Sequence, residues 1–494
     1  FFERNGRLGF RVTVEDLRRT KTVDSFELDG PAGEGVLPLV NRLAAKLSKA
    51  ARPFGTSSEE AFRDYGRGLN AGDRTAALRA LEAAATADPG FSLAYLTWAR
   101  VLSGGGDRDQ MLKVLAAARN AHPNAIDKAS LDYFLATVSG DANGREKALE
   151  ILTRSASADY GRLKELAELQ LAGRKFSDAI RSYEAASKLD EDDHVIWNQL
   201  GYAYAFAQDL AGARRALETY QKSLAPGDAN GLDSLGEVSF YLGDFTGAEK
   251  YFLEANAKNA AAQGGGELLK AAQARLMTGD LPGADGLFQR YLKATQAAQS
   301  ELAGYQQAQW EFLTGRRKAG MQRLEQILSK LPGEGPAVGA CQLSIWKLQT
   351  GDPQGAVSMA DQAVKSARSP AVRNMSAMCR SVAEGSKANS NSPVANAFGL
   401  MLARKYADAL PLIEKIYRET DPSFDGQVRA LLAWAYVENG RAADAKQLVA
   451  LYPIPMAAGD PLFASLIFPR FLYLRGVVLG SKQSRELYLK LGGS

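Results

Sequence analysis

The sequence predicts an all-α protein, a long array of antiparallel helix pairs preceded by a small β-hairpin and one helix. Three observations lead to this fold class. A pattern of apolar and small residues returns about every 35 residues, small residues lie twelve positions apart within each unit, and Gly and Pro recur between the units. A period of roughly 20 to 50 residues is typical of repeat proteins, in which each unit buries its apolar face against its neighbours.

The first fifty residues differ from the rest of the chain. Between residues 8 and 14 every second residue is apolar, the pattern of a half-buried strand, and residues 22–28 predict a second strand. A Gly/Pro-rich turn over residues 29–35 then leads into a predicted helix over residues 36–49. Two strands and one helix are too few for an independent core. We therefore expect upstream sequence to complete this sheet, or the hairpin to pack on the helical array or on another chain.

The edge of the predicted hairpin also bears on partners. An unpaired edge strand over residues 8–14 would accept a strand from another chain. Self-association through residues 1–50 is therefore an alternative that the sequence leaves open.

The helix-pair signal is clearest in the middle of the chain. Apolar and small residues at spacings i, i+3, i+4 and i+7 share one helical face, and they are Trp197, Leu200, Gly201 and Tyr204. Ala213 follows Gly201 by twelve residues, and Gly236 repeats the role of Gly201 after 35 residues. The same twelve-residue interval recurs from Ala99 to Met111, Ala136 to Ala148, Ala167 to Ala179, Ala272 to Ala284, Ala308 to Gly320 and Ala433 to Ala445.

The residue types explain how two such helices would pack. A small residue at each end of the interval lets the antiparallel helices approach closely, and larger neighbours such as Trp197 and Leu217 fill the remaining space. Glycines such as Gly243 and Gly279 are placed to end the first helix in the left-handed conformation. Prolines such as Pro226 and Pro332 stop the second helix.

These units resemble the tetratricopeptide-repeat family from about residue 58 onwards. The resemblance implies a right-handed α-solenoid of ten to eleven helix pairs over residues 58–453, with an irregular unit near 372–396 and capping helices over 454–494. Residues 1–52 are similar to the final strands and helix of the TolB-like domain that precedes such arrays in bacterial signalling proteins. That similarity implies a bacterial multidomain regulator whose array is its docking or sensing half.

The tetratricopeptide resemblance also implies a concave groove lined by the first helix of each pair. Carried onto this sequence, the candidate partner-binding residues are Asn198, Tyr202, Phe206, Asp233, Glu237, Tyr241, Met277, Tyr305, Gln309 and Trp434. Aromatic side chains beside amides suit a peptide or protein partner. The alternative is that these residues pack against a neighbouring helix or an internal one. The expected function is a protein-interaction scaffold, and the alternative is a structural subunit of a larger assembly.

Composition and motifs argue against other classes of function. The 60 basic and 56 acidic residues are mixed along the chain, which indicates neither a nucleic-acid surface nor a membrane anchor, and no apolar stretch is long enough to span a membrane. The only histidines, His122 and His194, have no metal-ligand spacing. The turn from Gly30 to Gly35 lacks the lysine of a phosphate loop. We expect no catalytic residues, no metal and no cofactor.

The two cysteines and the compartment are linked questions. We expect Cys341 and Cys379 to be separate buried thiols, although their separation of 38 residues would allow one bridge in an exported chain. The low cysteine content favours the cytoplasm, and export remains the alternative.

Overall fold

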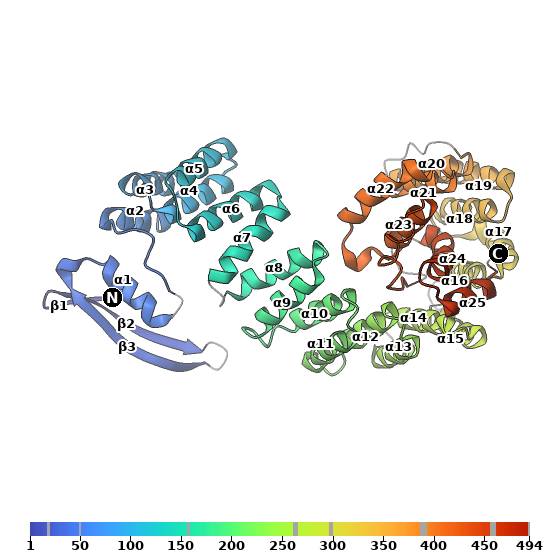
Figure 1. Ribbon diagram of the computed structural model, residues 1–494, viewed down its shortest axis with the longest axis horizontal. Coiled ribbons are helices and arrows are strands. Elements are labelled where there is room, and N and C mark those ends of the chain that lie inside the picture. The colour runs from blue at the N-terminus through green and yellow to red at the C-terminus, as the bar shows by residue number, and fades with distance from the viewer. Residues whose placement is uncertain are drawn as a thin grey trace. The chain divides into compact units, whose positions relative to one another are not determined.

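The computed structural model describes residues 1–16, 20–48, 51–155, 159–259, 265–295, 300–385, 393–454 and 461–492. Helices make up most of it, and a small sheet lies at the N-terminal end (Figure 1). This confirms the predicted fold class. The chain divides within helix α8 into two compact units, residues 1–169 and 170–494.

The first unit begins with a three-stranded antiparallel sheet in the order β1 (Phe2–Arg4), β2 (Arg7–Asp16), β3 (Lys21–Pro31). The two predicted strands are β2 and β3, and the sequence reasoning missed β1. The signal for β1 was Asn5-Gly6, whose positive φ angles of 53° and 72° suit the two-residue turn that joins β1 to β2. The turn η1 (Ala32–Glu34) and the predicted helix, α1 (Leu37–Leu47), follow.

Helix pairs complete the first unit. Side chains at helix N-termini satisfy exposed backbone groups, as where Ser58 accepts a hydrogen bond from the Ala61 N–H and Asp73 accepts one from Ala76. The helices are α2 (Glu59–Leu69), α3 (Arg74–Ala87), α4 (Ser92–Gly104), α5 (Arg108–Asn120), α6 (Ala125–Ser139), α7 (Ala142–Ser155) and α8 (Tyr160–Ala172), which spans the division between the units.

The second unit continues the helix pairs. In chain order it contains α9 (Phe176–Ser187), α10 (His194–Phe206), α11 (Leu210–Ser223), α12 (Asn230–Tyr241), α13 (Phe245–Asn259), α14 (Gly266–Met277), α15 (Leu281–Thr295), α16 (Ser300–Leu313), α17 (Arg317–Ile327), η2 (Leu328–Lys330), α18 (Gly335–Gln349), α19 (Pro353–Ser366), α20 (Pro370–Ala383), α21 (Pro393–Leu402), α22 (Tyr406–Glu419), η3 (Pro422–Phe424), α23 (Gly426–Glu438), α24 (Pro461–Val478) and α25 (Lys482–Lys490).

Small residues lie where the paired helices meet, as the twelve-residue interval predicts. A Cβ atom at Gly201 would lie 2.5 Å from the Leu217 side chain, and one at Gly236 would lie 2.5 Å from the Phe252 ring. Both separations are far below van der Waals contact, so only glycine allows α10 to pack on α11 and α12 on α13 at this distance.

The C-terminal segment lies against the inner helices of the second unit. Figure 1 shows α24 between α16, α18 and α23, and these elements are in contact. The Trp346 indole N–H of α18 donates to Ser465 Oγ of α24 at 3.0 Å, and Gln483 of α25 donates to the Met277 carbonyl at 3.4 Å. The Tyr452 N–H donates to the Tyr241 carbonyl at 2.9 Å. The described residues from Ala445 onwards therefore share one core with α12 to α18.

Residues 442–450 form consecutive turns, although the spacing from Ala433 to Ala445 predicts a regular helix there. Two arginines explain the difference. Arg429 donates to the carbonyls of Leu448 and Leu451, while Arg475 donates to those of Val449 and Ala450. Carbonyls bound by side chains in this way need no helical partner. Part of the irregular unit predicted near 372–396, residues 386–392, lies outside the described residues.

The expectation of two separate thiols is wrong in this structure. Cys341 on α18 and Cys379 on α20 form a disulfide, with their Cα atoms 5.7 Å apart. Helices α18 and α20 pack side by side, so a separation of 38 residues places the two cysteines face to face. No helix in the described ranges is long and apolar enough to cross a membrane.

Candidate functional site

The predicted groove residues fall into two groups by burial. The first group is buried, with exposed fractions of 9% or less, and contains Phe206 on α10, Met277 on α14, Tyr305 and Gln309 on α16, and Trp434 on α23. The second group is partly exposed and contains Asn198 and Tyr202 on α10 with Asp233, Glu237 and Tyr241 on α12.

The buried group packs against neighbouring helices and the C-terminal segment. The Trp434 ring lies 4.6 Å from the Arg470 guanidinium of α24, and its indole N–H donates to Glu438 at 3.0 Å. Tyr305 and Met277 belong to the same buried core as α24 and α25. Phe206 packs on Phe176 of α9. For these residues the packing alternative describes the structure.

The partly exposed group surrounds a lysine that the sequence reasoning did not select. Lys270 on α14 donates to both carboxylate oxygens of Asp233, at 2.7 and 2.8 Å, and to Glu237 at 2.9 Å. The Tyr202 hydroxyl donates to the other oxygen of Glu237 at 2.7 Å. We call Tyr202, Asp233, Glu237 and Lys270 the inner polar cluster. It joins three successive first helices, α10, α12 and α14.

Sequence reasoning missed Lys270 because the repeat spacing selected only Met277 on this helix. The signal in the sequence was the pair Asp233 and Glu237 on the preceding first helix, α12. A half-buried pair of acidic side chains favours a cation nearby, and Lys270 is that cation.

Burial and charge act together in the inner polar cluster. Its three charged side chains are between 20% and 25% exposed. Burial raises the pKa of Asp233 above its usual value although Lys270 opposes the shift. Burial disfavours the Lys270 ammonium, but the carboxylates of Glu237 and Asp233 outweigh it and raise the pKa of Lys270. Burial also raises the pKa of the Tyr202 phenol well above its usual value. One amino group thus contacts two carboxyl groups.

The surroundings of the cluster add further acceptors. Glu267 on α14 is buried, and burial raises the pKa of its carboxyl group. The Asn198 Oδ1 atom is shielded from solvent and accepts no hydrogen bond from the described residues. The inner polar cluster itself has two carboxyl groups, those of Asp233 and Glu237, for one amino group, that of Lys270, and it suits a ligand that supplies N–H groups or a positive charge.

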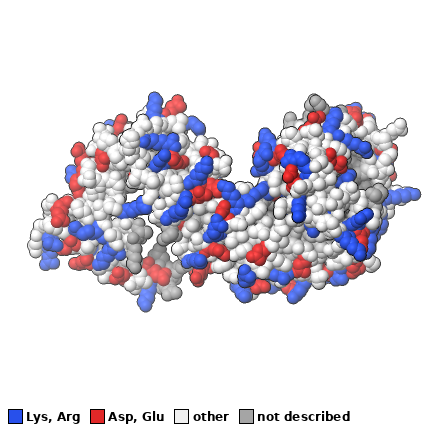
Figure 2. Space-filling view, viewed as in Figure 1, with Lys and Arg blue, Asp and Glu red and all other residues white. Residues whose placement is uncertain are grey.

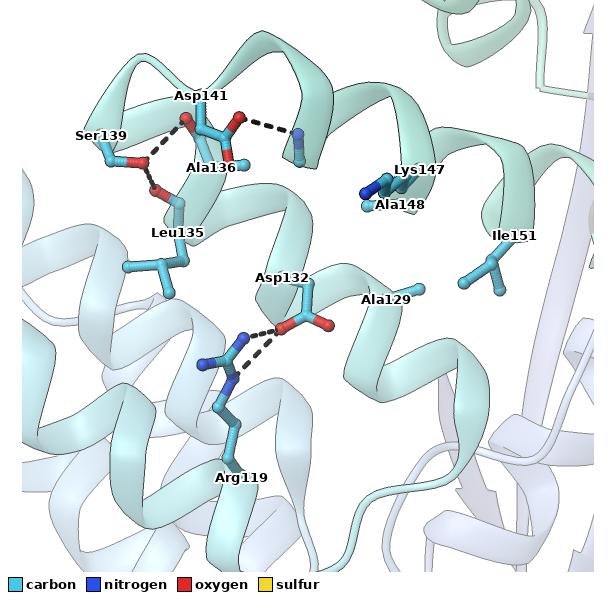
Figure 3. Close-up of a pocket in the computed structure, with 11 residues that line it drawn as sticks. Arg119, Ala129, Asp132, Leu135, Ala136, Ser139, Asp141, Lys147, Ala148 and Ile151 are labelled. Carbon is cyan, nitrogen blue, oxygen red and sulfur yellow. Dashed lines mark hydrogen bonds and ion pairs between the residues drawn. The ribbon is translucent and has the colours of Figure 1, made fainter.

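A separate hollow of about 280 Å³ lies between α5, α6 and α7 in the first unit (Figure 3). Arg119 and Asp132 form an ion pair across it, and Asp141 accepts a hydrogen bond from the Gly144 N–H at 2.9 Å. Because these polar groups satisfy one another, the hollow is best explained by helix packing.

Basic and acidic side chains are interspersed over the face in Figure 2. Among the described residues, no group of three or more His, Cys, Asp or Glu side chains is arranged to hold a metal ion.

Comparison with known proteins found a match for one part of this chain. Residues 400–467 match the family model described as Tetratricopeptide repeat. No curated protein matches the chain.

Solved structures that resemble the chain have low sequence identity. Naa15/Naa10 bound to HypK-THB is 15% identical, with a TM-score of 0.40 over 87% of this chain and 74% of that one. A tetratricopeptide repeat protein from Parabacteroides merdae is 17% identical, with a TM-score of 0.33 over 51% of this chain and 98% of that one. The MamA protein is 18% identical, with a TM-score of 0.30 over 35% of this chain and 92% of that one.

The family match lies in the region of α22 and α23, and the same helix-pair spacing extends through the described second unit. The glycines at the helix contacts and the left-handed glycines after the first helices accompany this match to the tetratricopeptide-repeat model over residues 400–467.

Proposed function

We propose that this chain is a protein-interaction scaffold that binds a segment of a partner protein on the inner surface of α10, α12 and α14. The observation that supports this proposal is the inner polar cluster with its excess of acceptors. It is partly exposed, whereas the predicted groove residues on α16 and α23 are buried. A partner segment that carries Lys or Arg side chains matches this surface.

The bound segment would contribute mainly through its cations and backbone N–H groups. An incoming guanidinium would donate hydrogen bonds to Asp233 and Glu237 in place of part of the Lys270 network. Hydrogen bonds to charged groups in a partly buried site contribute more than neutral ones, so a few such contacts can fix the register of a peptide.

A photo-crosslinking experiment tests the location of binding. A photoreactive residue at Asn198 should trap a defined partner in cells, whereas the same residue at Glu218, which is exposed on α11, should not. Equal trapping at both positions would show that the inner surface is not the binding site.

Binding measurements with the trapped partner then test the chemistry. Neutral substitutions Asp233→Asn and Glu237→Gln should each weaken binding by about tenfold or more, because each removes half of the negative charge. The matched control Glu218→Gln should leave affinity unchanged. Circular dichroism should show the same helical content in all three variants.

We also propose that the array is the docking half of a bacterial regulator. This rests on the resemblance of residues 1–52 to the end of a TolB-like domain. The full reading frame of the gene tests it, and a frame without a regulatory domain upstream of this array would refute it.

The disulfide supports the exported alternative for the compartment. Structural disulfides persist in oxidising compartments and are rare in the cytosol. Thiol alkylation before and after reduction, carried out on freshly lysed cells, distinguishes the two cases. Cysteines that react before reduction would favour the cytoplasm.

A further inference from the structure

The amino group of Lys270 uses its full set of donors within the inner polar cluster. It has three N–H groups, and three carboxyl oxygens accept them: two of Asp233, at 2.7 and 2.8 Å, and one of Glu237, at 2.9 Å. The second Glu237 oxygen accepts a hydrogen bond from the Tyr202 hydroxyl at 2.7 Å. Because a carboxyl oxygen has two lone pairs, each of these four oxygens can accept one more hydrogen bond.

A second hydrogen-bonded Tyr–Glu pair, on α22 and α23, shows what such a pair binds when an arginine is near. The Tyr436 hydroxyl donates to Glu414 at 3.0 Å. The Arg441 guanidinium donates to the same Glu414 oxygen at 3.4 Å, and it lies 4.4 Å from the centre of the Tyr436 ring. One guanidinium therefore bonds to the carboxyl group and also lies over the ring of the tyrosine that donates to it.

A third pair, in the first unit, has a similar arrangement. The Tyr133 hydroxyl donates to Glu165 at 2.6 Å, and the Arg145 guanidinium lies 3.5 Å from the other Glu165 oxygen. At the inner polar cluster, no arginine among the described residues bonds to Glu237. The cluster therefore has the acceptors of an arginine site, and its cation from this chain is a lysine.

Lysine and arginine differ in what they would gain at this position. An incoming lysine supplies the same three N–H groups that Lys270 already supplies from its own helix, so the exchange adds no hydrogen bond. A guanidinium has five N–H groups in a planar fork. Asp233 and Glu237 lie one turn apart on α12, so such a fork can bond to both carboxyl groups, and its flat face suits the partly exposed Tyr202 ring.

We propose that the inner polar cluster is an arginine-selective subsite, in which a guanidinium of the bound segment lies on the Tyr202 ring and donates to Asp233 and Glu237. Lys270 gives the subsite its selectivity, because it occupies the position that the ammonium of an incoming lysine would take. This inference rests on the proposed function and narrows the bound segment to one that presents arginine.

Two blocked tripeptides, Ala-Arg-Ala and Ala-Lys-Ala, test the selectivity in ligand-observed NMR titrations of the full chain. The native chain should bind the arginine tripeptide about tenfold more tightly than the lysine tripeptide, as expected for one additional hydrogen bond to a charged group. The two probes carry the same charge, so non-specific electrostatic attraction does not distinguish them.

Two variants test the roles of the lysine and of the aromatic ring. Lys270→Met opens the ammonium position, so the lysine tripeptide should bind about tenfold more tightly than it does to the native chain and approach the affinity of the arginine tripeptide. Tyr202→Leu leaves Lys270 in place and should weaken the arginine tripeptide about threefold, with a smaller change for the lysine tripeptide. The control Glu218→Gln, at an exposed position on α11, should change neither affinity.

The outcomes separate this inference from the proposed function. Equal affinity of the native chain for the two tripeptides, or an undiminished preference for arginine in Lys270→Met, would overturn the selectivity assigned to Lys270. If Glu237→Gln then weakens both tripeptides, the cluster still binds cations and the proposed function stands. If Glu237→Gln leaves both affinities unchanged, or if neither tripeptide binds at millimolar concentrations, the cluster is not a cation site and the proposed function fails together with the subsite.

Discussion

Arg174 connects two parts of the second unit that are about 250 residues apart in the sequence. Its guanidinium donates to Asp425 at 2.5 Å and to the carbonyls of Tyr417 and Thr420, each at 3.0 Å, and it lies 3.8 Å from the centre of the Tyr417 ring. The Asp425 side chain is only 2% exposed and also accepts a hydrogen bond from Arg429 at 2.6 Å. This contact holds the turn after α8 against η3 and the start of α23.

The substitution Arg174→Ala removes these contacts without adding a new group. Breaking a buried ion pair costs about 3–5 kcal/mol when the remaining charge is left without a partner. Here Arg429 stays bound to Asp425, and Arg174 is itself 18% exposed, so the lower end of that range applies. We expect a loss of about 3 kcal/mol in the free energy of unfolding of the second unit. Residue 174 has the left-handed backbone conformation, with φ of 59°. Because Arg and Ala meet a similar cost in this conformation, the backbone contribution to the free energy of unfolding changes little.

The assay combines denaturant unfolding with hydrogen exchange. The midpoint of the second unit's transition should fall, and amides in α23 and residues 417–425 should exchange faster. The control Arg181→Ala removes an exposed arginine paired with Asp178 on α9 and should cost less than 1 kcal/mol. If Arg174→Ala costs no more than this control, the contact does not join these two parts of the unit.

Three further predictions concern packing, the disulfide and pH. Gly236→Val should cost about 3 kcal/mol or more in unfolding measurements because its side chain would overlap the Phe252 ring, whereas Gly286→Ala, with open space at its Cβ position, should be neutral or stabilising. Cys379→Ser should lower stability by about 3–4 kcal/mol, as expected for the loop closed by the disulfide, and reductant should bring the native chain to the same denaturation midpoint; an unchanged midpoint in reductant would contradict the bridge. The folded state raises the pKa of Lys270, so the stabilisation that Lys270 contributes should be complete below its ordinary pKa of 10.5 and should decline as the pH rises above that value. The difference in melting temperature between the native chain and Lys270→Met should therefore shrink only at alkaline pH.

Sequence reasoning succeeded where structure depends on neighbouring residues. The spacing from Gly201 to Ala213 reflects two helices that pack directly on each other, and the structure shows the close contact that requires a glycine. The alternation in β2 likewise follows from one strand and its nearest partner. Strand β1 was predictable in the same way, because Asn5-Gly6 is a strong hairpin signal. The strand before this turn has only three residues, Phe2–Arg4, which is too short to show an alternating pattern.

Sequence reasoning failed where distant segments meet. Nothing in the spacing around Trp434 indicates that Arg470 of α24 covers its ring, and nothing near Met277 indicates the contact with Gln483. The disulfide belongs to the same class, because it depends on how α18 and α20 pack and a separation of 38 residues is compatible with several arrangements. The turns over residues 442–450 arise from arginines that lie 13 or more residues away in sequence.

These distant contacts change how substitutions on the inner surface should be interpreted. Trp434 occupies the same repeat position as Tyr202, and Tyr305 the same position as Asn198, yet they are 5% and 9% exposed and share the core with the C-terminal helices. A charged residue at Tyr305 or Trp434 would therefore destabilise the fold, and any loss of binding would reflect unfolding. Neutral substitutions at Asp233 and Glu237 change the charge of the side chain with little change in its volume. At these two positions, loss of partner binding can therefore be separated from loss of structure.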